Sequence, residues 1–202
     1  MTSNLFSTDA ILLTKKSFGD GHMNLCLLTS EFGMLRASAF GGQRLSKRFK
    51  GGIELFQIFE GEIQRNIVQE HPSFSLCCIK KIKHRFTNIP LMMERYVAVS
   101  YIQELASMLL NPLETGGDTS NTYFEMVVNS MDIINNSEDR NSILDEVYNI
   151  SNSLYKDTGF IPQVECANNS NAKLCRLENF NTSILEKTPK SFLLLSELYN
   201  HS

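Results

Sequence analysis

The sequence predicts an α+β protein in which a β domain comes first and an all-α domain follows. Residues 10–68 contain short apolar segments separated by glycines, whereas the apolar residues beyond about residue 74 recur at helical spacing. The chain has 202 residues, of which 42% are hydrophobic and 20% charged, so it can form one or two folded domains and is not a largely disordered protein. We expect the β domain to cover residues 1–78 and the helical domain to cover residues 79–202.

We predict five strands in the first domain, at residues 10–18, 23–29, 34–40, 53–60 and 63–68. In the second of them Leu25 and Leu27 alternate with Asn24 and Cys26, which is typical of a strand with one buried face. Strands at such close and regular spacing favour a small sandwich or barrel. A closed five-stranded barrel of the oligonucleotide/oligosaccharide-binding (OB) type leaves no strand edge exposed, so we expect this fold.

Four helices are expected in the second domain. The first covers residues 91–110 and ends before Pro112, and the second carries an apolar stripe between residues 124 and 134. Ser137 is the predicted N-cap of the third helix and Gly159 its end. Thr188-Pro189 opens the last helix. The polar, Asn-rich segment 163–188 is expected to be irregular, and residues 80–85 to form a basic hinge.

Charge is distributed unevenly along the chain. The net charge is −3, but residues 1–85 hold twelve Lys and Arg against seven acids, and residues 86–202 hold seven against fifteen. The first half is therefore at +5 and the second at −8. This asymmetry favours contact between the first half and a polyanion, with chance clustering of charges on a solvated face as the alternative.

A basic loop is the sharpest local signal. No acid lies between Gly33 and Ile53, and cations in such a loop can follow a phosphate backbone. We predict a DNA-binding surface formed by the cations of the first half: Lys15, Lys16, Arg36, Arg44, Lys47, Arg48, Lys50 and Arg65. Phe40 and Phe49 lie among them and could stack on bases, but we favour the barrel core for both because the chain has no tryptophan to fill it.

No residue pattern indicates catalysis. The chain lacks a phosphate-binding loop, a Gly-x-Ser-x-Gly elbow and a His-Glu-x-x-His motif, and its four histidines are far apart in sequence. We expect no catalytic residue, no cofactor and no enzymatic activity. We expect a cytoplasmic protein, since no signal peptide is visible, no apolar run approaches the ~20 residues of a membrane helix, and the five cysteines are odd in number and loosely spaced.

The cysteines do not form a complete zinc motif. Cys77 and Cys78 are expected to be buried structural thiols. Cys166 and Cys175 are each followed, three residues later, by Asn169 and Glu178 where a structural zinc site would have two further cysteines. Two thiolates, an amide and a carboxylate suit zinc poorly, so we predict no metal in the region 163–188.

Six segments form a pattern together: residues 10–21 (AILLTKKSFGDG), 27–35 (LLTSEFGML), 39–44 (AFGGQR), 48–52 (RFKGG), 101–105 (YIQEL) and 159–164 (GFIPQV). In this order and spacing they resemble the RecO family of bacterial recombination mediators. The similarity is strongest over residues 9–60, and its specificity comes from the order and spacing of the segments.

The resemblance implies a DNA repair protein with an N-terminal OB barrel and a C-terminal helical domain. Such a protein binds single- and double-stranded DNA, anneals complementary strands and, with RecR, helps to load recombinase onto DNA coated with single-strand-binding protein. It would lie in the cytoplasm, associated with the nucleoid. Many members carry a four-cysteine zinc module, of which this chain keeps the first and third cysteines, at Cys166 and Cys175.

The acidic second half is assigned to protein partners. By resemblance, one partner is the acidic C-terminal tail of single-strand-binding protein, which would need an apolar groove with a basic rim, from Arg95, Lys173, Arg176, Lys187 or Lys190. The alternative is that the helices only support the barrel. Two other functions stay open: an RNA-binding OB protein, and an adaptor that has lost DNA binding.

Overall fold

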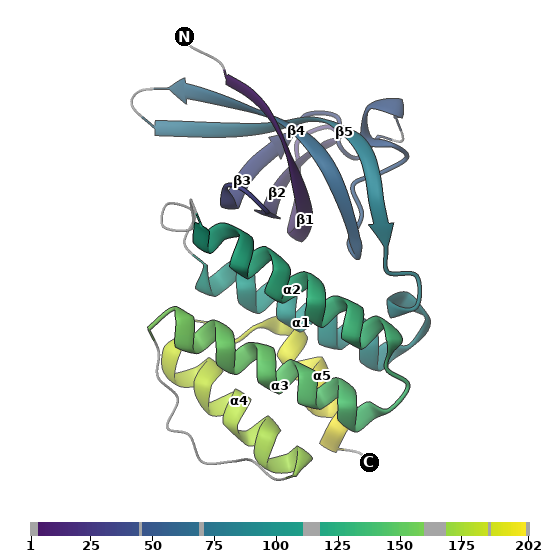
Figure 1. Ribbon diagram of the computed structural model, residues 1–202, viewed down its shortest axis with the longest axis vertical. Helices are drawn as coiled ribbons and strands as arrows, with labels where there is room; N and C mark the ends of the chain where they lie inside the picture. The colour runs from purple at the N-terminus through teal and green to yellow at the C-terminus, as the bar shows by residue number, and fades with distance from the viewer. Residues whose placement is uncertain are drawn as a thin grey trace. The chain divides into compact units, whose positions relative to one another are not determined.

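In the computed structural model the chain is described over residues 4–44, 46–68, 71–110, 118–159, 169–185 and 187–200. The strands are β1 (Asn4–Phe18), β2 (His22–Thr29), β3 (Gly33–Ala39), β4 (Gln57–Val68) and β5 (His71–Arg85). The helices are α1 (Met93–Leu109), α2 (Asp118–Asn136), α3 (Arg140–Asp157), α4 (Ser170–Ile184) and α5 (Lys190–Asn200), with short 3-10 helices η1 (Lys47–Phe49) and η2 (Ile89–Leu91). The predicted order, β and then α, is confirmed (Figure 1).

Two compact units make up the chain. One contains Met1–Arg85 and Asn111–Glu125, and the other contains Phe86–Leu110 and Met126–Ser202. The boundary expected after residue 78 falls inside β5, which continues to Arg85. Residues 80–85, expected to be a hinge, are therefore part of the sheet.

The five strands close into a barrel in the order β1-β2-β3-β5-β4. Neighbouring strands are antiparallel except β3 and β5, which pair in parallel through Ala37 and Phe74. This is a five-stranded barrel of the OB arrangement, and closure removes the free edges. Its core is lined by apolar side chains of every strand, together with Phe49 and Ile53 from the segment between β3 and β4. Phe49 is 0% exposed, so its predicted place in the core is confirmed.

The fourth and fifth strands differ from the prediction. Residues 53–60 and 63–68 were expected to be two strands separated by a turn at Gly61, but Gly61 lies inside the single strand β4. A Cβ at this position would lie 3.0 Å from Leu76 Cδ1 and 3.2 Å from Phe59 Cε2, so the glycine serves close packing inside the barrel.

The true fifth strand has a spacing that resembles a helix. Three irregularities in the β4–β5 register leave Cys77, Lys80 and Lys83 of β5 without a paired residue on β4. Each extra residue is a bulge that resets the alternation of the strand. The inward residues Leu76, Ile79 and Ile82 are therefore three apart instead of two, which is why helical spacing is expected from about residue 74 while the structure has a strand.

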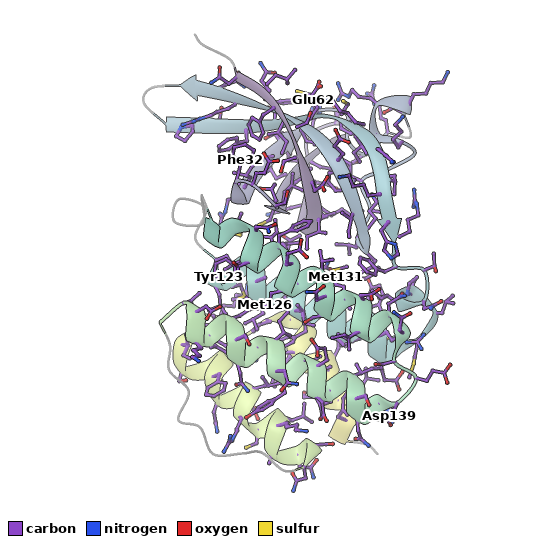
Figure 2. All side chains as sticks on the ribbon, in the orientation of Figure 1. Phe32, Glu62, Tyr123, Met126, Met131 and Asp139 are labelled. Atoms are coloured by element: carbon purple, nitrogen blue, oxygen red, sulfur yellow. The ribbon has the colours of Figure 1, made fainter. Side chains whose placement is uncertain are left out.

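In the helical unit α1 packs against α3 and α5, and α4 packs against the same two helices. The predicted N-cap of α3 was Ser137, but the N-cap is Asp139, whose carboxylate accepts the Ser142 backbone N–H at 2.8 Å (Figure 2). This hydrogen bond holds the pKa of Asp139 below its usual value. Gly159 follows the helix at φ +88°, and its N–H bonds to the Lys156 carbonyl, as expected at a helix end.

The segment expected to be irregular contains the helix α4. Asn169 is its N-cap, because its side-chain oxygen accepts the Ala172 backbone N–H at 2.8 Å. The buried Asn181 of α4 then accepts hydrogen bonds from Tyr101 Oη at 3.2 Å and Tyr155 Oη at 2.7 Å. This helix, rich in polar residues, is thus held by an amide that two buried hydroxyls share and by the buried side chains of Leu174 and Leu177.

Candidate nucleic-acid interface

One outer surface of the barrel combines cations, polar groups and aromatic rings. It is formed by three residues from each of the first three strands, counting the residue that follows β3. We call it the outer β1–β2–β3 face, and its members are Thr14, Lys16 and Phe18; His22, Asn24 and Cys26; and Arg36, Ser38 and Phe40. In an OB barrel the β2–β3 surface is the usual place for oligonucleotides.

Strand pairing arranges these residues in three rows. Thr14, Cys26 and Arg36 are directly opposite one another, and so are Lys16, Asn24 and Ser38. The intervening residues Leu25, Ala37 and Ala39 point into the core, so the alternation of a strand sends the rows outward. Ser38 Oγ lies 3.4 Å from Asn24 Oδ1.

The third row is aromatic. The ring centroids of Phe18 and His22 are 5.5 Å apart, and those of His22 and Phe40 are 5.4 Å apart with an interplanar angle of 73°. Phe40 is 54% exposed. Its predicted place in the core is therefore wrong, because Phe40 is one residue beyond the inward-facing Ala39 and so lies outside the barrel.

Hydrogen bonds fix the chain around Phe40. The Gly41 N–H donates to His22 Nδ1 at 2.9 Å, and Gly41 itself is at φ +72°. The Gln43 N–H donates to the Gly21 carbonyl at 3.2 Å, and Arg48 donates from its guanidinium to the Phe40 carbonyl. The turn after β3 is thus bound to the β1–β2 turn.

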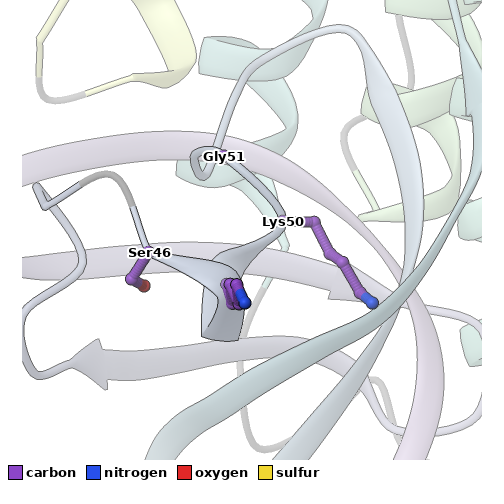
Figure 3. A pocket seen from close by; sticks show the side chains of 4 residues that line it. Ser46, Lys50 and Gly51 are labelled. Atoms are coloured by element: carbon purple, nitrogen blue, oxygen red, sulfur yellow. The ribbon is translucent and has the colours of Figure 1, made fainter.

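Three of the predicted cations, Arg44, Lys47 and Lys50, belong to the segment that follows Phe40. The Arg44 side chain passes Gly21 of the β1–β2 turn, where a Cβ would lie 3.5 Å from Arg44 Nε. Lys47 and Lys50 line a hollow of about 470 Å³ together with Ser46 and Gly51 (Figure 3). Lys50 ends η1 in the left-handed conformation, at φ +51°.

Two of the eight predicted cations are held by the protein's own groups. Lys15 is opposite the core residue Leu25, and its ammonium donates to the Ile53 carbonyl at 2.8 Å and pairs with Glu54 at 3.3 Å. Arg48, besides its bond to the Phe40 carbonyl, lies over the Phe49 ring at 4.6 Å. Arg65 is opposite Asn4 and Phe74 on the β4–β5 hairpin, away from the outer β1–β2–β3 face in register. Lys16 and Arg36 lie on that face and are exposed.

On the outer surface of β1, β4 and β5, by contrast, acids lie beside some of the cations. Lys80 pairs with Glu62 at 3.1 Å and donates to Ser7 Oγ at 2.5 Å; Glu62 is labelled in Figure 2. Lys83 pairs with Asp9 at 2.6 Å, and this hydrogen bond raises the pKa of the lysine. Two lysines there are thus paired with acids, whereas no acid belongs to the outer β1–β2–β3 face.

The thiols of the barrel differ in environment. Burial raises the pKa of Cys26, on the outer β1–β2–β3 face, to about 11, although Arg36 opposes the shift. Cys77 and Cys78 are half-buried in β5, and burial, followed by the charge of Glu62, raises the pKa of Cys77. Cys26 is therefore protonated at neutral pH and acts as a packing group.

No cluster of three or more metal-ligating side chains occurs within the ranges that the structure describes. Cys166 lies outside those ranges, Asn169 caps α4, and Cys175 is exposed on that helix. The prediction that this region binds no metal stays a prediction.

The helical unit carries an apolar groove of about 530 Å³ between α1 and α5. Its lining consists of Met93, Glu94, Val97, Arg140, Leu194, Glu197 and Leu198. Three of the predicted rim cations bond elsewhere: Arg95 donates to the Ser137 carbonyl at 2.8 Å, Lys173 pairs with Asp145, and Arg176 donates to Tyr148 Oη at 3.0 Å. The cation of the groove is Arg140, which pairs with Glu94 at 3.2 Å.

The fold and this surface define an OB-barrel protein with a cationic, aromatic-edged face and a separate helical unit. No protein-family model matches the chain. The chain is similar to the DNA repair protein RecO of Rhodopirellula baltica, with 26% identity over 125 residues, which are 62% of this chain and 44% of that protein. The chain thus aligns with less than half the length of that relative. Among the helices in the described ranges, none is long and apolar enough to cross a membrane.

Proposed function

We propose that the protein is a DNA repair and recombination factor that binds DNA through the outer β1–β2–β3 face of its barrel. The observation that carries the proposal is the separation of charge on the barrel. Lys16 and Arg36 are exposed on an acid-free face, whereas Lys80 and Lys83 are paired with acids on another. Exposed cations such as Lys16 and Arg36 can bind a phosphate directly. A lysine that is paired with a carboxylate must first break that ion pair before it can bind a phosphate.

The similarity to RecO supports proposals for more specific activities on DNA. These are binding of single- and double-stranded DNA, annealing of complementary strands, and loading of recombinase together with RecR. All of them need binding and positioning of DNA, so we propose that the protein is no enzyme and acts at the nucleoid in the cytoplasm.

The α1–α5 groove supports a protein partner. Its apolar wall, which includes Met93 and Leu194, suits the apolar end of the tail of single-strand-binding protein, and Arg140 suits a carboxylate. Because Arg140 already pairs with Glu94 and a second acid, Glu197, lines the groove, we expect this binding to be weak and sensitive to salt.

A titration of the purified protein onto labelled single-stranded DNA, duplex DNA and RNA of one length tests the proposal. We expect binding to DNA that weakens steeply with salt, without preference for RNA, followed by faster pairing of complementary strands. Preference for RNA would favour an RNA-binding barrel. Absence of salt-dependent binding to any of the three would refute the proposal and favour an adaptor.

A further inference from the structure

We infer that Phe40 is a base-stacking residue that makes the barrel favour unpaired strands over duplex DNA. This inference rests on the proposed function and adds to it the part of the nucleic acid that is recognised. Cations alone bind any phosphate backbone, paired or not. Only a group that meets the face of a base distinguishes the two, because the faces of paired bases are covered by their neighbours.

The ring is both exposed and held in place. More than half of its surface is accessible, while its neighbours Ala39 and Gly42 are buried. The bond from Arg48 to the Phe40 carbonyl and the bond from Gly41 to His22 fix the backbone, and the ring contacts the His22 ring while more than half of its surface stays accessible. A ring ordered before binding loses little entropy when a base stacks on it.

The surroundings of the ring supply the rest of a single-strand site. Phe40 continues the outward series of β3 that contains Arg36 and Ser38, so a strand running along this face would meet a cation, a hydroxyl and a ring in succession. Arg44 reaches the β1–β2 turn that begins beside Phe18 and His22. Bases stacked on rings, with phosphates beside cations, are the usual arrangement for unpaired strands on OB barrels.

The chain has no tryptophan, so a single introduced tryptophan reports on one position. Phe40→Trp places the reporter in the proposed site. Phe32→Trp is the matched control, because Phe32 is also exposed, at 37%, but lies in the β2–β3 turn at the other end of these strands and contacts Phe6. We expect saturating oligo(dT) to quench the emission of Phe40→Trp and to leave Phe32→Trp unchanged.

Affinity measurements separate stacking from charge. Phe40→Leu keeps an apolar side chain without a ring, and we expect it to weaken oligo(dT) binding by about 5- to 100-fold at fixed salt. The salt dependence, the affinity for a duplex hairpin and the affinity for an abasic oligonucleotide of the same charge should change by less than about twofold, since they depend on phosphates. Phe40→Tyr should retain binding, and Phe32→Leu should bind as the wild type does.

The outcomes are distinct. If the wild type binds oligo(dT) with a steep salt dependence but Phe40→Leu binds equally well, the inference is wrong and the proposed function stands. Equal losses for oligo(dT), abasic strand and hairpin also overturn it, because Phe40 would then only support the loop. If the wild type binds no DNA at low salt, both fail.

Discussion

Replacing Lys16 and Arg36 together by alanine tests whether the outer β1–β2–β3 face contacts phosphates. Of the eight predicted cations, Lys15 and Arg48 are held internally and Arg65 lies on the β4–β5 hairpin, which leaves five for DNA. At ~0.7 counterions released per phosphate of a single strand, five contacts give a slope of log K against log salt of about −3.5. The double variant should reduce this slope to about −2.1.

The same arithmetic gives the expected affinities. Between 50 and 200 mM salt the wild type should lose about 100-fold in affinity and the variant only about 20-fold. If the two proteins bind equally at 1 M salt, where the counterion contribution vanishes, these slopes make the variant bind about 60-fold more weakly at the lower salt and about 10-fold more weakly at the higher. Fluorescence anisotropy of a labelled oligo(dT) across this range measures both quantities.

The control removes the same charge from a different surface. Lys80→Ala with Lys83→Ala also lowers the net charge by two, but both lysines are paired with acids on β1 and β4. We expect its slope to stay near that of the wild type. Equal slopes for both double variants, in proteins with native circular dichroism, would show that net charge and not this face determines binding.

Four further results are expected. Asn181→Leu should lower the free energy of unfolding in urea by about 2–4 kcal/mol, because two buried tyrosine hydroxyls lose their acceptor, whereas a change at an exposed α4 position should have little effect. Burial raises the pKa of Tyr199 to about 12, so the unfolded chain loses this proton first, and stability should fall as pH rises from about 10 to 12, with a shallower fall in Tyr199→Phe. The exposed thiol of Cys175 should react with iodoacetamide at pH 8 well before the thiol of Cys26, because Cys26 is buried and its pKa is raised to about 11. Mass spectrometry measures both rates, and equal rates would contradict the burial of Cys26. Asn169→Ala should cost about 1 kcal/mol through loss of the α4 cap, Asn169→Asp should not, and a chelator should leave the melting temperature of the wild type unchanged.

The sequence allowed prediction of the fold class, of the first three strands and of the helices with strong apolar stripes. Gly61 was misread because glycine marks both turns and close packing, and only the neighbouring Leu76 distinguishes them. β5 was misread because bulges change the period of a strand, and bulges depend on pairing with β4, which is not visible in one segment. α4 was missed because its buried residues are only Leu174, Leu177 and the polar Asn181, which leave too short an apolar stripe in an Asn-rich segment.

The candidate site was predictable in composition but not in geometry. The cations of the first half indicated polyanion binding, yet they include Lys15, which bonds to the loop at Ile53, and its neighbour Lys16, which is exposed. Neighbours in sequence lie on opposite faces of a strand, so charge counted along the chain mixes the two. The sequence alone also does not show on which side of β3 Phe40 lies. In the structure Ala39 pairs with Met23 and points into the core, so the next residue, Phe40, points outward.

The bulges of β5 affect where the lysines of this strand lie and which acids they neutralise. An extra residue turns the strand locally, and the extra residues Lys80 and Lys83 are the ones that reach Ser7 and Asp9 across the neighbouring strand. Each of these lysines places a cation beside a carboxylate of β1 or β4, so the two carboxylates add little negative field on that side of the barrel. The outer β1–β2–β3 face, which also holds Phe40, contains the exposed cations Lys16 and Arg36 and no acid. The acidic net charge of the chain is therefore compatible with DNA binding, because at physiological ionic strength a phosphate senses charges within about 8 Å and not the sum over the molecule.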